Sequence, residues 1–110
     1  MGFVYMIQNK INNKIYIGKT IRSISERWRE HQYRAENNYN GYLYNAIRKY
    51  GIENFTVLEI EKCEDEIIDE RERFYISFYD SLNNQKGYNL TNGGDGNNLY
   101  NYDLIREYWD

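Results

Sequence analysis

Two short runs of β-branched and aromatic residues near the N-terminus constrain the fold more than any other feature of this chain. Residues 3–9 and 14–18 have the composition of strands, and the Asn-Asn pair between them is typical of a tight turn. They therefore predict a β-hairpin. A loop of even length places Tyr5 and Tyr16 on the same face of that hairpin. Because apolar residues occupy both faces, we expect helices to cover the hairpin on both sides.

The rest of the chain alternates between helical and extended patterns. Apolar residues recur with helical spacing in three segments, and Ser23 to Glu26 has the form of a capping box before the first of them. Gly51 is placed to end the second helix. The predicted elements are helices at 24–36, 41–50 and 65–79, a strand at 54–60, and a short strand from 87 that runs into a glycine-rich turn. We therefore predict an α/β (α+β) fold: a small three-stranded, mostly antiparallel sheet flanked by helices.

Length and composition indicate one compact domain. The chain has 110 residues, close to the commonest size of a single domain. Its single cysteine excludes an intramolecular disulfide framework and a zinc site built from several cysteines. Because we find neither the apolar core of a signal peptide nor a stretch long enough for a membrane span, we expect a soluble, intracellular protein. We place the domain at 1–94 and read 95–110 as an extension, either a terminal helix or the start of a linker.

Charge is distributed unevenly along the chain. Residues 1–50 carry nine Lys or Arg and three Glu, a net charge of +6, whereas the whole chain has a net charge of −3. A local basic patch attracts phosphate backbones whatever the total charge. The alternative is an ordinary solvated helix face. The positive side chains of the patch are Lys19, Arg22, Arg27, Arg29 and Arg34, and we expect Lys19, Arg22 and Arg34 to bind DNA.

One carboxylate lies where the helical pattern has an apolar residue. Glu72 falls inside the apolar arc of the predicted helix 65–79. Desolvating a carboxylate costs several kcal/mol unless a cation or hydrogen bonds compensate, so the pattern implies a metal ion or an arginine partner. Arg71, in the same arc, leaves open the alternative of a structural ion pair.

These residue types could together hydrolyse a phosphodiester bond. The reaction needs an activated water, a cation on the phosphate and a way to neutralise the leaving group. A carboxylate-held cation, an arginine and a tyrosine–histidine pair supply all three. A tyrosine serves as base only if nearby positive charge lowers its pKa from about 10, which requires roughly 4 kcal/mol. Each residue alone also has a simpler interpretation, since strand tyrosines and a lone histidine are common packing residues.

The order and spacing of these residues resemble the GIY-YIG nuclease family over about residues 3–94. The matching positions are Phe3-Val4-Tyr5 and Tyr16-Ile17-Gly18 for the two family triplets, Arg27 and His31 for the helix motif, Glu72 for the metal-binding glutamate, and Asn89 for the asparagine that follows it. Phe3 stands where the family has glycine, at a position that takes no part in the chemistry. Glu70 is the alternative metal ligand if the helix register differs by two residues.

The resemblance implies a role for each matching residue. Tyr5 or Tyr16 would activate the attacking water, and His31 would orient or deprotonate a tyrosine. Arg27 would bind the scissile phosphate, Glu72 would coordinate one Mg²⁺ or Mn²⁺, and Asn89 would support the site structurally. Lys19 matches a lysine that some branches of the family carry. We expect the site to lie on the tyrosine face of the hairpin.

The same resemblance implies a function for the whole domain. It would be a metal-dependent endonuclease domain that hydrolyses DNA, the N-terminal catalytic part of a homing-type or other site-specific endonuclease. Target selection would then belong to a C-terminal DNA-binding region in a longer chain. Two alternatives remain: a non-catalytic nucleic-acid-binding module on the same fold, and a tyrosine-rich interaction domain that binds no nucleic acid.

Overall fold

The computed structural model describes residues 1–93, which form three strands, three α-helices and two short 3₁₀ turns. The elements are β1 (Gly2–Asn9), β2 (Ile15–Thr20), α1 (Ile24–Glu36), α2 (Tyr42–Tyr50), η1 (Ile52–Asn54), β3 (Phe55–Cys63), η2 (Asp65–Ile67) and α3 (Ile68–Tyr79). The predicted extension 95–110 lies outside the described residues.

The three strands form one antiparallel sheet in the order β2-β1-β3. Tyr5 lies opposite Gly18 and Ile7 lies opposite Tyr16, so both tyrosines share one face, as predicted. In the turn, the side-chain oxygen of Asn12 accepts a hydrogen bond of 2.9 Å from the Lys14 amide. The predicted α/β fold with its small antiparallel sheet is confirmed.

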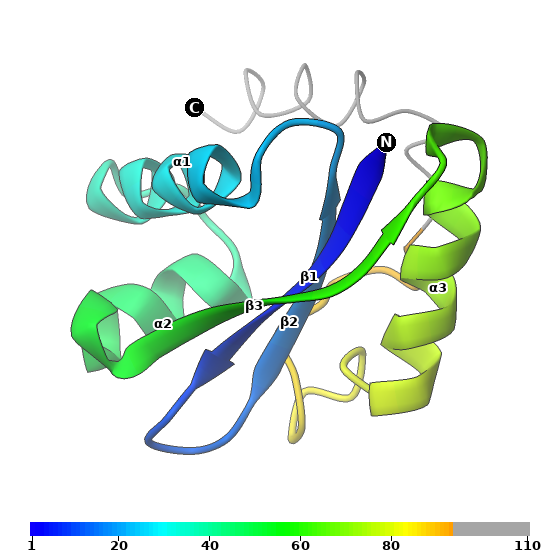
Figure 1. Ribbon diagram of the computed structural model, residues 1–110. Coiled ribbons are helices and arrows are strands. Elements are labelled where there is room, and N and C mark those ends of the chain that lie inside the picture. The colour runs from blue at the N-terminus through cyan, green and yellow to red at the C-terminus, as the bar shows by residue number, and fades with distance from the viewer. Residues whose placement is uncertain (94–110) are drawn as a thin grey trace.

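Helices cover both faces of this sheet. Figure 1 shows α1 and α2 on one side of the sheet and α3 on the other. The predicted capping box starts α1, because the Ser23 hydroxyl accepts a hydrogen bond of 3.1 Å from the Glu26 amide. At the end of α2, the Gly51 amide donates to the Ile47 carbonyl with a φ of 91°. Local sequence signals therefore determine the start of α1 and the end of α2.

Two apolar clusters hold these layers together. Tyr5 and Ile7 pack with Leu43 and Ile47 on the α1 and α2 side. On the other side, Val4, Ile15 and Ile17 pack with Ile68 and Ile76 of α3. Successive residues of β1 and β2 thus point into different clusters, which fixes the register of the hairpin. Among residues 1–93, no helix combines the length and apolar character that a membrane span needs.

The predicted short strand from residue 87 does not form. Gly87 makes an isolated parallel bridge to Ile15 instead. The ladder is then continued by a side chain, because Asn89 accepts from the Ile17 amide and donates to the Ile17 carbonyl, both at 2.9 Å. An amide side chain thereby occupies the place of a peptide group beside the edge strand β2.

Candidate functional site

The tyrosine of β1 lies against the histidine of α1 inside the protein. The Tyr5 hydroxyl is 2.8 Å from Nε2 of His31, and the two residues are 1% and 0% exposed. Gly18 makes room for this contact, since a Cβ there would lie 2.4 Å from the Tyr5 hydroxyl. Tyr16 is half-buried, and its ring meets the His31 ring edge-on at 5.4 Å between centroids. The histidine thus contacts both tyrosines.

A third tyrosine and an arginine continue this polar group on the far side of His31. Nδ1 of His31 is 3.1 Å from the hydroxyl of Tyr44 on α2, and Nη1 of Arg34 donates to the same hydroxyl at 3.1 Å. Burial, together with the positive charges of Arg27 and Arg34, holds the pKa of His31 well below its usual range. The imidazole is therefore neutral at neutral pH.

Arg27 lies one turn before His31, on the same buried face of α1, as predicted. Its side chain is 4% exposed, and Nη1 donates to Glu30 at 2.8 Å. Nη1 of Arg22 also reaches Glu30, at 2.6 Å. Burial alone would raise the pKa of Glu30, but hydrogen bonds from Arg22 and Arg27 lower it to about 2. One carboxylate thus holds two cations at the start of α1.

Glu72 is buried, as its position in the apolar arc predicts. It is 8% exposed, whereas Glu70 on the same helix is exposed, which favours Glu72 over the alternative register. Nζ of Lys19 lies 3.5 Å from Glu72 and also hydrogen-bonds to Asp69. Two carboxylates of α3 therefore surround one lysine of β2.

Arg71 is not the partner that the structural alternative required. Its Nε donates to Glu61 of β3 at 3.0 Å, and Tyr75 donates to the same carboxylate at 2.7 Å. Arg71 thus pairs with Glu61, which removes the alternative that it serves as the ion-pair partner of Glu72, and Lys19 is a cation that lies beside Glu72.

The expectation that all site residues share the tyrosine face is also wrong. Lys19 lies opposite Val4 in the register, so it points toward α3, while Tyr16 and Gly18 point toward α1. Figure 1 shows the two sets of helices on opposite sides of the sheet. Because β2 is at the edge of the sheet, the group around Tyr16 and the group around Lys19 lie on the two faces of a single strand. Groups from both faces could meet at the outer edge of β2.

The three predicted DNA-binding residues differ sharply in exposure. Arg22 is exposed, Lys19 is 6% exposed and Arg34 is 2% exposed. The guanidinium of Arg34 contacts Tyr44 and lies near the Tyr39 ring, so a DNA contact does not fit its position. The sequence patterns did not identify Tyr44 or Asp69 as site residues. A signal for Arg34 did exist, since it follows Arg27 by seven residues and so returns to the same helix face.

Glu72 fits a single hydrated cation rather than a closed metal cage. Residues 1–93 contain no group of three or more His, Cys, Asp or Glu side chains placed to hold a metal. Mg²⁺ usually keeps several waters and takes one or two carboxylates together with substrate phosphate oxygens. A buried glutamate with a second carboxylate, Asp69, nearby provides that donor set.

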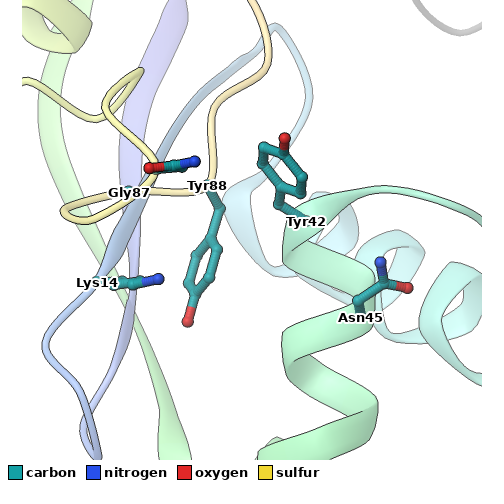
Figure 2. Close-up of a pocket in the computed structure, with 6 residues that line it drawn as sticks. Lys14, Tyr42, Asn45, Gly87 and Tyr88 are labelled. Atoms are coloured by element: carbon teal, nitrogen blue, oxygen red, sulfur yellow. The ribbon is translucent and has the colours of Figure 1, made fainter.

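A separate hollow lies between α2 and the segment that follows α3. Figure 2 shows the Tyr88 ring standing between Lys14 and α2. The Tyr88 hydroxyl accepts hydrogen bonds from the side-chain amides of Asn9 and Asn12, at 3.1 and 3.2 Å. The hollow measures about 270 Å³ and is lined by Lys14, Tyr42, Asn45, Asn84, Gly87 and Tyr88, none of them a predicted catalytic residue.

Several known proteins are similar to this chain in sequence, and solved structures are similar to it in fold. A family model described as the GIY-YIG catalytic domain matches residues 1–89. Uncharacterized protein 019R of Invertebrate iridescent virus 6 is 36% identical over 92 residues, covering 81% of the chain and 33% of that protein. Intron-associated endonuclease 1 of Enterobacteria phage T4 is 30% identical over 107 residues, covering 94% of the chain and 42% of that protein. The chain thus spans less than half the length of these curated relatives.

Solved structures of a catalytic domain resemble the chain over most of its length. The catalytic domain of homing endonuclease I-TevI superposes with a TM-score of 0.69 at 28% identity, covering 83% of this chain and 99% of that one. A mutant of the catalytic domain of intron endonuclease I-TevI gives a TM-score of 0.73 at 29% identity, covering 84% and 96%. The similarity therefore extends over nearly the whole of each solved domain.

Proposed function

This chain belongs to the GIY-YIG nuclease family, and from that premise we propose that residues 1–94 form a metal-dependent endonuclease domain that hydrolyses DNA phosphodiester bonds. The observation that carries the proposal is the buried contact between Tyr5 and His31, with Arg27 one turn away on the same helix face. A phenol and an imidazole can supply the proton transfer that phosphodiester hydrolysis needs, and a guanidinium can neutralise the charge of the phosphate.

The two halves of the site meet, in this proposal, at the outer edge of β2. The scissile phosphate lies there between the α1 side and the α3 side, with Arg27 neutralising its charge. Tyr16 is half-buried and therefore accessible to an attacking water, while Tyr5 is held by His31 inside the protein. Asn89 keeps the backbone of β2 in place through its two hydrogen bonds to Ile17.

Glu72 is the residue that holds the divalent cation in this proposal. A bound Mg²⁺ or Mn²⁺ would supply Lewis-acid stabilisation of charge on the phosphate oxygens. Lys19 acts on the same carboxylate from 3.5 Å and fixes its position next to β2. Asp69, which pairs with the same lysine, would be the second carboxylate beside such a cation.

The same lysine favours a second candidate function. An ammonium that already neutralises Glu72 would make a metal ion unnecessary, and the domain would then be a nucleic-acid-binding module without catalysis. The two candidates differ in one observable, the dependence of DNA cleavage on a divalent cation.

Plasmid nicking tests the proposal directly. The purified chain should nick supercoiled plasmid with Mg²⁺ or Mn²⁺ and lose that activity with EDTA. Glu72→Gln and Tyr16→Phe should each reduce the rate about a hundredfold or more, because each removes a group that acts on the transition state. Glu70→Gln is the matched control, since it makes the same chemical change at an exposed position of the same helix. If the wild type leaves DNA intact at high concentration, the binding module becomes the better interpretation.

The parent protein, in this proposal, is a homing-type or other site-specific endonuclease that acts inside cells. The chain spans 33% and 42% of two curated relatives, which leaves room in proteins of that length for a separate DNA-binding region. Residues 95–110 would then connect the catalytic domain to that region.

A further inference from the structure

Four polar side chains form a continuous row through the interior on the α1 and α2 side of the sheet. Arg34, Tyr44, His31 and Tyr5 are 2%, 4%, 0% and 1% exposed. Their contacts follow one another at 3.1, 3.1 and 2.8 Å. One end of the row is a permanent cation and the other end is a tyrosine of the proposed site. The catalytic scheme above uses only the last two residues.

The cation leaves the hydroxyl hydrogen of Tyr44 available for donation to His31. A guanidinium has donors and no acceptor, so the Tyr44 oxygen must accept from Arg34. A phenol that accepts from a cation becomes a stronger donor through its own hydrogen. Nδ1 of His31, 3.1 Å away, is a strong neutral acceptor for that hydrogen. A neutral imidazole that accepts at Nδ1 carries its hydrogen on Nε2.

We infer that Arg34 and Tyr44 are positioning residues that hold His31 as the Nε2–H tautomer, so that His31 donates a hydrogen bond to the Tyr5 oxygen. The inference rests on the proposed function and deepens it. In this tautomer Nε2 already carries a hydrogen, so His31 orients the Tyr5 oxygen and does not take the tyrosine's proton.

The charges around the row favour the same arrangement. Two arginines on α1 disfavour a third positive charge on the imidazole. The groups that face Tyr5 and His31 are Arg27 and Arg34 from α1, Tyr44 from α2, Tyr16 from β2, and Glu59 from β3, which lies opposite Tyr5 in the register and is exposed. The lowered pKa of His31 agrees with a neutral ring.

The single histidine of the chain allows a direct measurement. Long-range nitrogen–proton correlation spectra of the ¹⁵N-labelled chain assign the tautomer without ambiguity about which residue is observed. At neutral pH we expect the Nε2–H form in the wild type, and a mixture or the Nδ1–H form in Tyr44→Phe. An Nδ1–H or imidazolium wild type, or an unchanged tautomer in Tyr44→Phe, overturns the inference. The wild-type measurement needs neither nuclease activity nor a variant that folds.

Kinetics then test whether the tautomer matters for cleavage. Tyr44→Phe should lower kcat about tenfold at neutral pH with KM unchanged, because it loosens the position of His31 and Tyr5 without touching the substrate. Tyr50→Phe is the control, because Tyr50 packs against the same apolar cluster and takes no part in the row. A kcat of Tyr44→Phe equal to that of Tyr50→Phe overturns the link between the row and catalysis. If the chain proves to have no nuclease activity, the proposed function fails and the tautomer alone decides the inference.

Discussion

Gly18 shows how one missing side chain can shape a site. It lies within β2, directly opposite Tyr5, and is not part of a turn. A Cβ at this position would lie 2.4 Å from both Cζ and the hydroxyl oxygen of Tyr5, far inside van der Waals contact. The glycine of the second motif therefore provides space for the tyrosine of the first. The two motifs depend on each other through this contact.

Replacing that glycine should move Tyr5 away from His31. We expect Gly18→Ala to lower the free energy of unfolding by about 2 kcal/mol through overpacking, and to slow plasmid nicking more than tenfold. Denaturant unfolding and nicking assays measure the two effects. Gly2→Ala is the control within the same sheet, because its Cβ would come closest to Cδ1, the end of the Ile68 side chain, at 2.3 Å, and would lie 3.4 Å from an Asp65 side-chain oxygen. Equal effects of the two substitutions would contradict this explanation of Gly18.

Glu30 should make stability depend on pH in the acid range. Its pKa is lowered from 4.5 to about 2 in the folded protein. A lowered carboxylate pKa stabilises the fold above the unfolded value, and the contribution is lost as the pH falls through the folded value. Glu30→Gln should therefore cost about 1 kcal/mol at neutral pH, after allowance for solvent screening of this partly exposed group.

The pH dependence of that difference identifies its source. Unfolding experiments from neutral pH down to about 2 should show the wild type and Glu30→Gln converging below pH 4.5. Other titrating groups affect both proteins equally, so the difference isolates Glu30. A difference that stays constant over the whole range would mean that packing, and not charge, accounts for the cost.

Single residues were predicted well where their neighbours are local and poorly where the partner is distant. The helical spacing of Arg27 and His31, and the place of Glu72 in an apolar arc, follow from the periodicity of one helix. The burial of Arg34 depends on Tyr44, which belongs to another helix. Lys19 likewise depends on two carboxylates fifty residues further on. The periodicity of a single helix or strand cannot indicate contacts between residues that lie on different elements.

At the scale of elements, the edge of β2 is completed by a segment that is not a strand. The Ile15 amide donates to the Lys86 carbonyl and the Tyr88 amide donates to the Ile15 carbonyl, at 3.1 and 2.8 Å. Beyond that point the side chain of Asn89 takes over, and the Ser81 hydroxyl donates to the same amide oxygen at 2.7 Å. The composition after Gly87 is typical of a strand and predicted one. In the structure, the hydrogen bonds along the edge of β2 are completed by the side-chain amide of Asn89 instead.

Asn89→Asp should break this arrangement on one side only. The carboxylate keeps its acceptor for the Ile17 amide but loses the donor to the Ile17 carbonyl, and it buries a charge against that oxygen. We expect a loss of about 2 to 3 kcal/mol in the free energy of unfolding. Asn84→Asp, at an exposed position, should change stability by less than about 0.5 kcal/mol. Similar values for the two variants would show that Asn89 does not support β2.

The packing of whole elements explains the one large error of prediction. The hairpin, α1 and α2 follow from capping, turn chemistry and periodicity, and the structure contains them at the predicted places. Which face of the sheet α3 covers is not a local property, because both faces of the hairpin are apolar. Glu72 was therefore assigned to the wrong face. Its link to the site runs through Lys19 on the edge strand.

At the scale of the molecule, the uneven charge of the sequence becomes an uneven distribution in space. Four of the nine basic residues of the first half belong to β2 and α1, namely Lys19, Arg27, Arg29 and Arg34. On the opposite side, α3 carries Asp69, Glu70 and Glu72 together with Arg71 and Arg73. Phosphate backbones should therefore approach from the α1 side and the edge of β2. A small basic surface of this kind supports weak, electrostatic binding with little reading of base sequence.

Binding of the isolated chain to DNA should accordingly be weak, steeply dependent on salt and nearly independent of sequence. With about three phosphate contacts, the logarithm of the association constant should fall with the logarithm of salt concentration with a slope of about −3. Arg22→Gln should reduce that slope by about one, because Arg22 is the exposed cation of the predicted DNA-binding set. Arg73→Gln, exposed on α3 on the other side of the sheet, should leave it unchanged. Fluorescence anisotropy with several unrelated duplexes measures these slopes. Tight binding to one duplex, or equal slopes for the two variants, would place DNA recognition inside this domain or on another face.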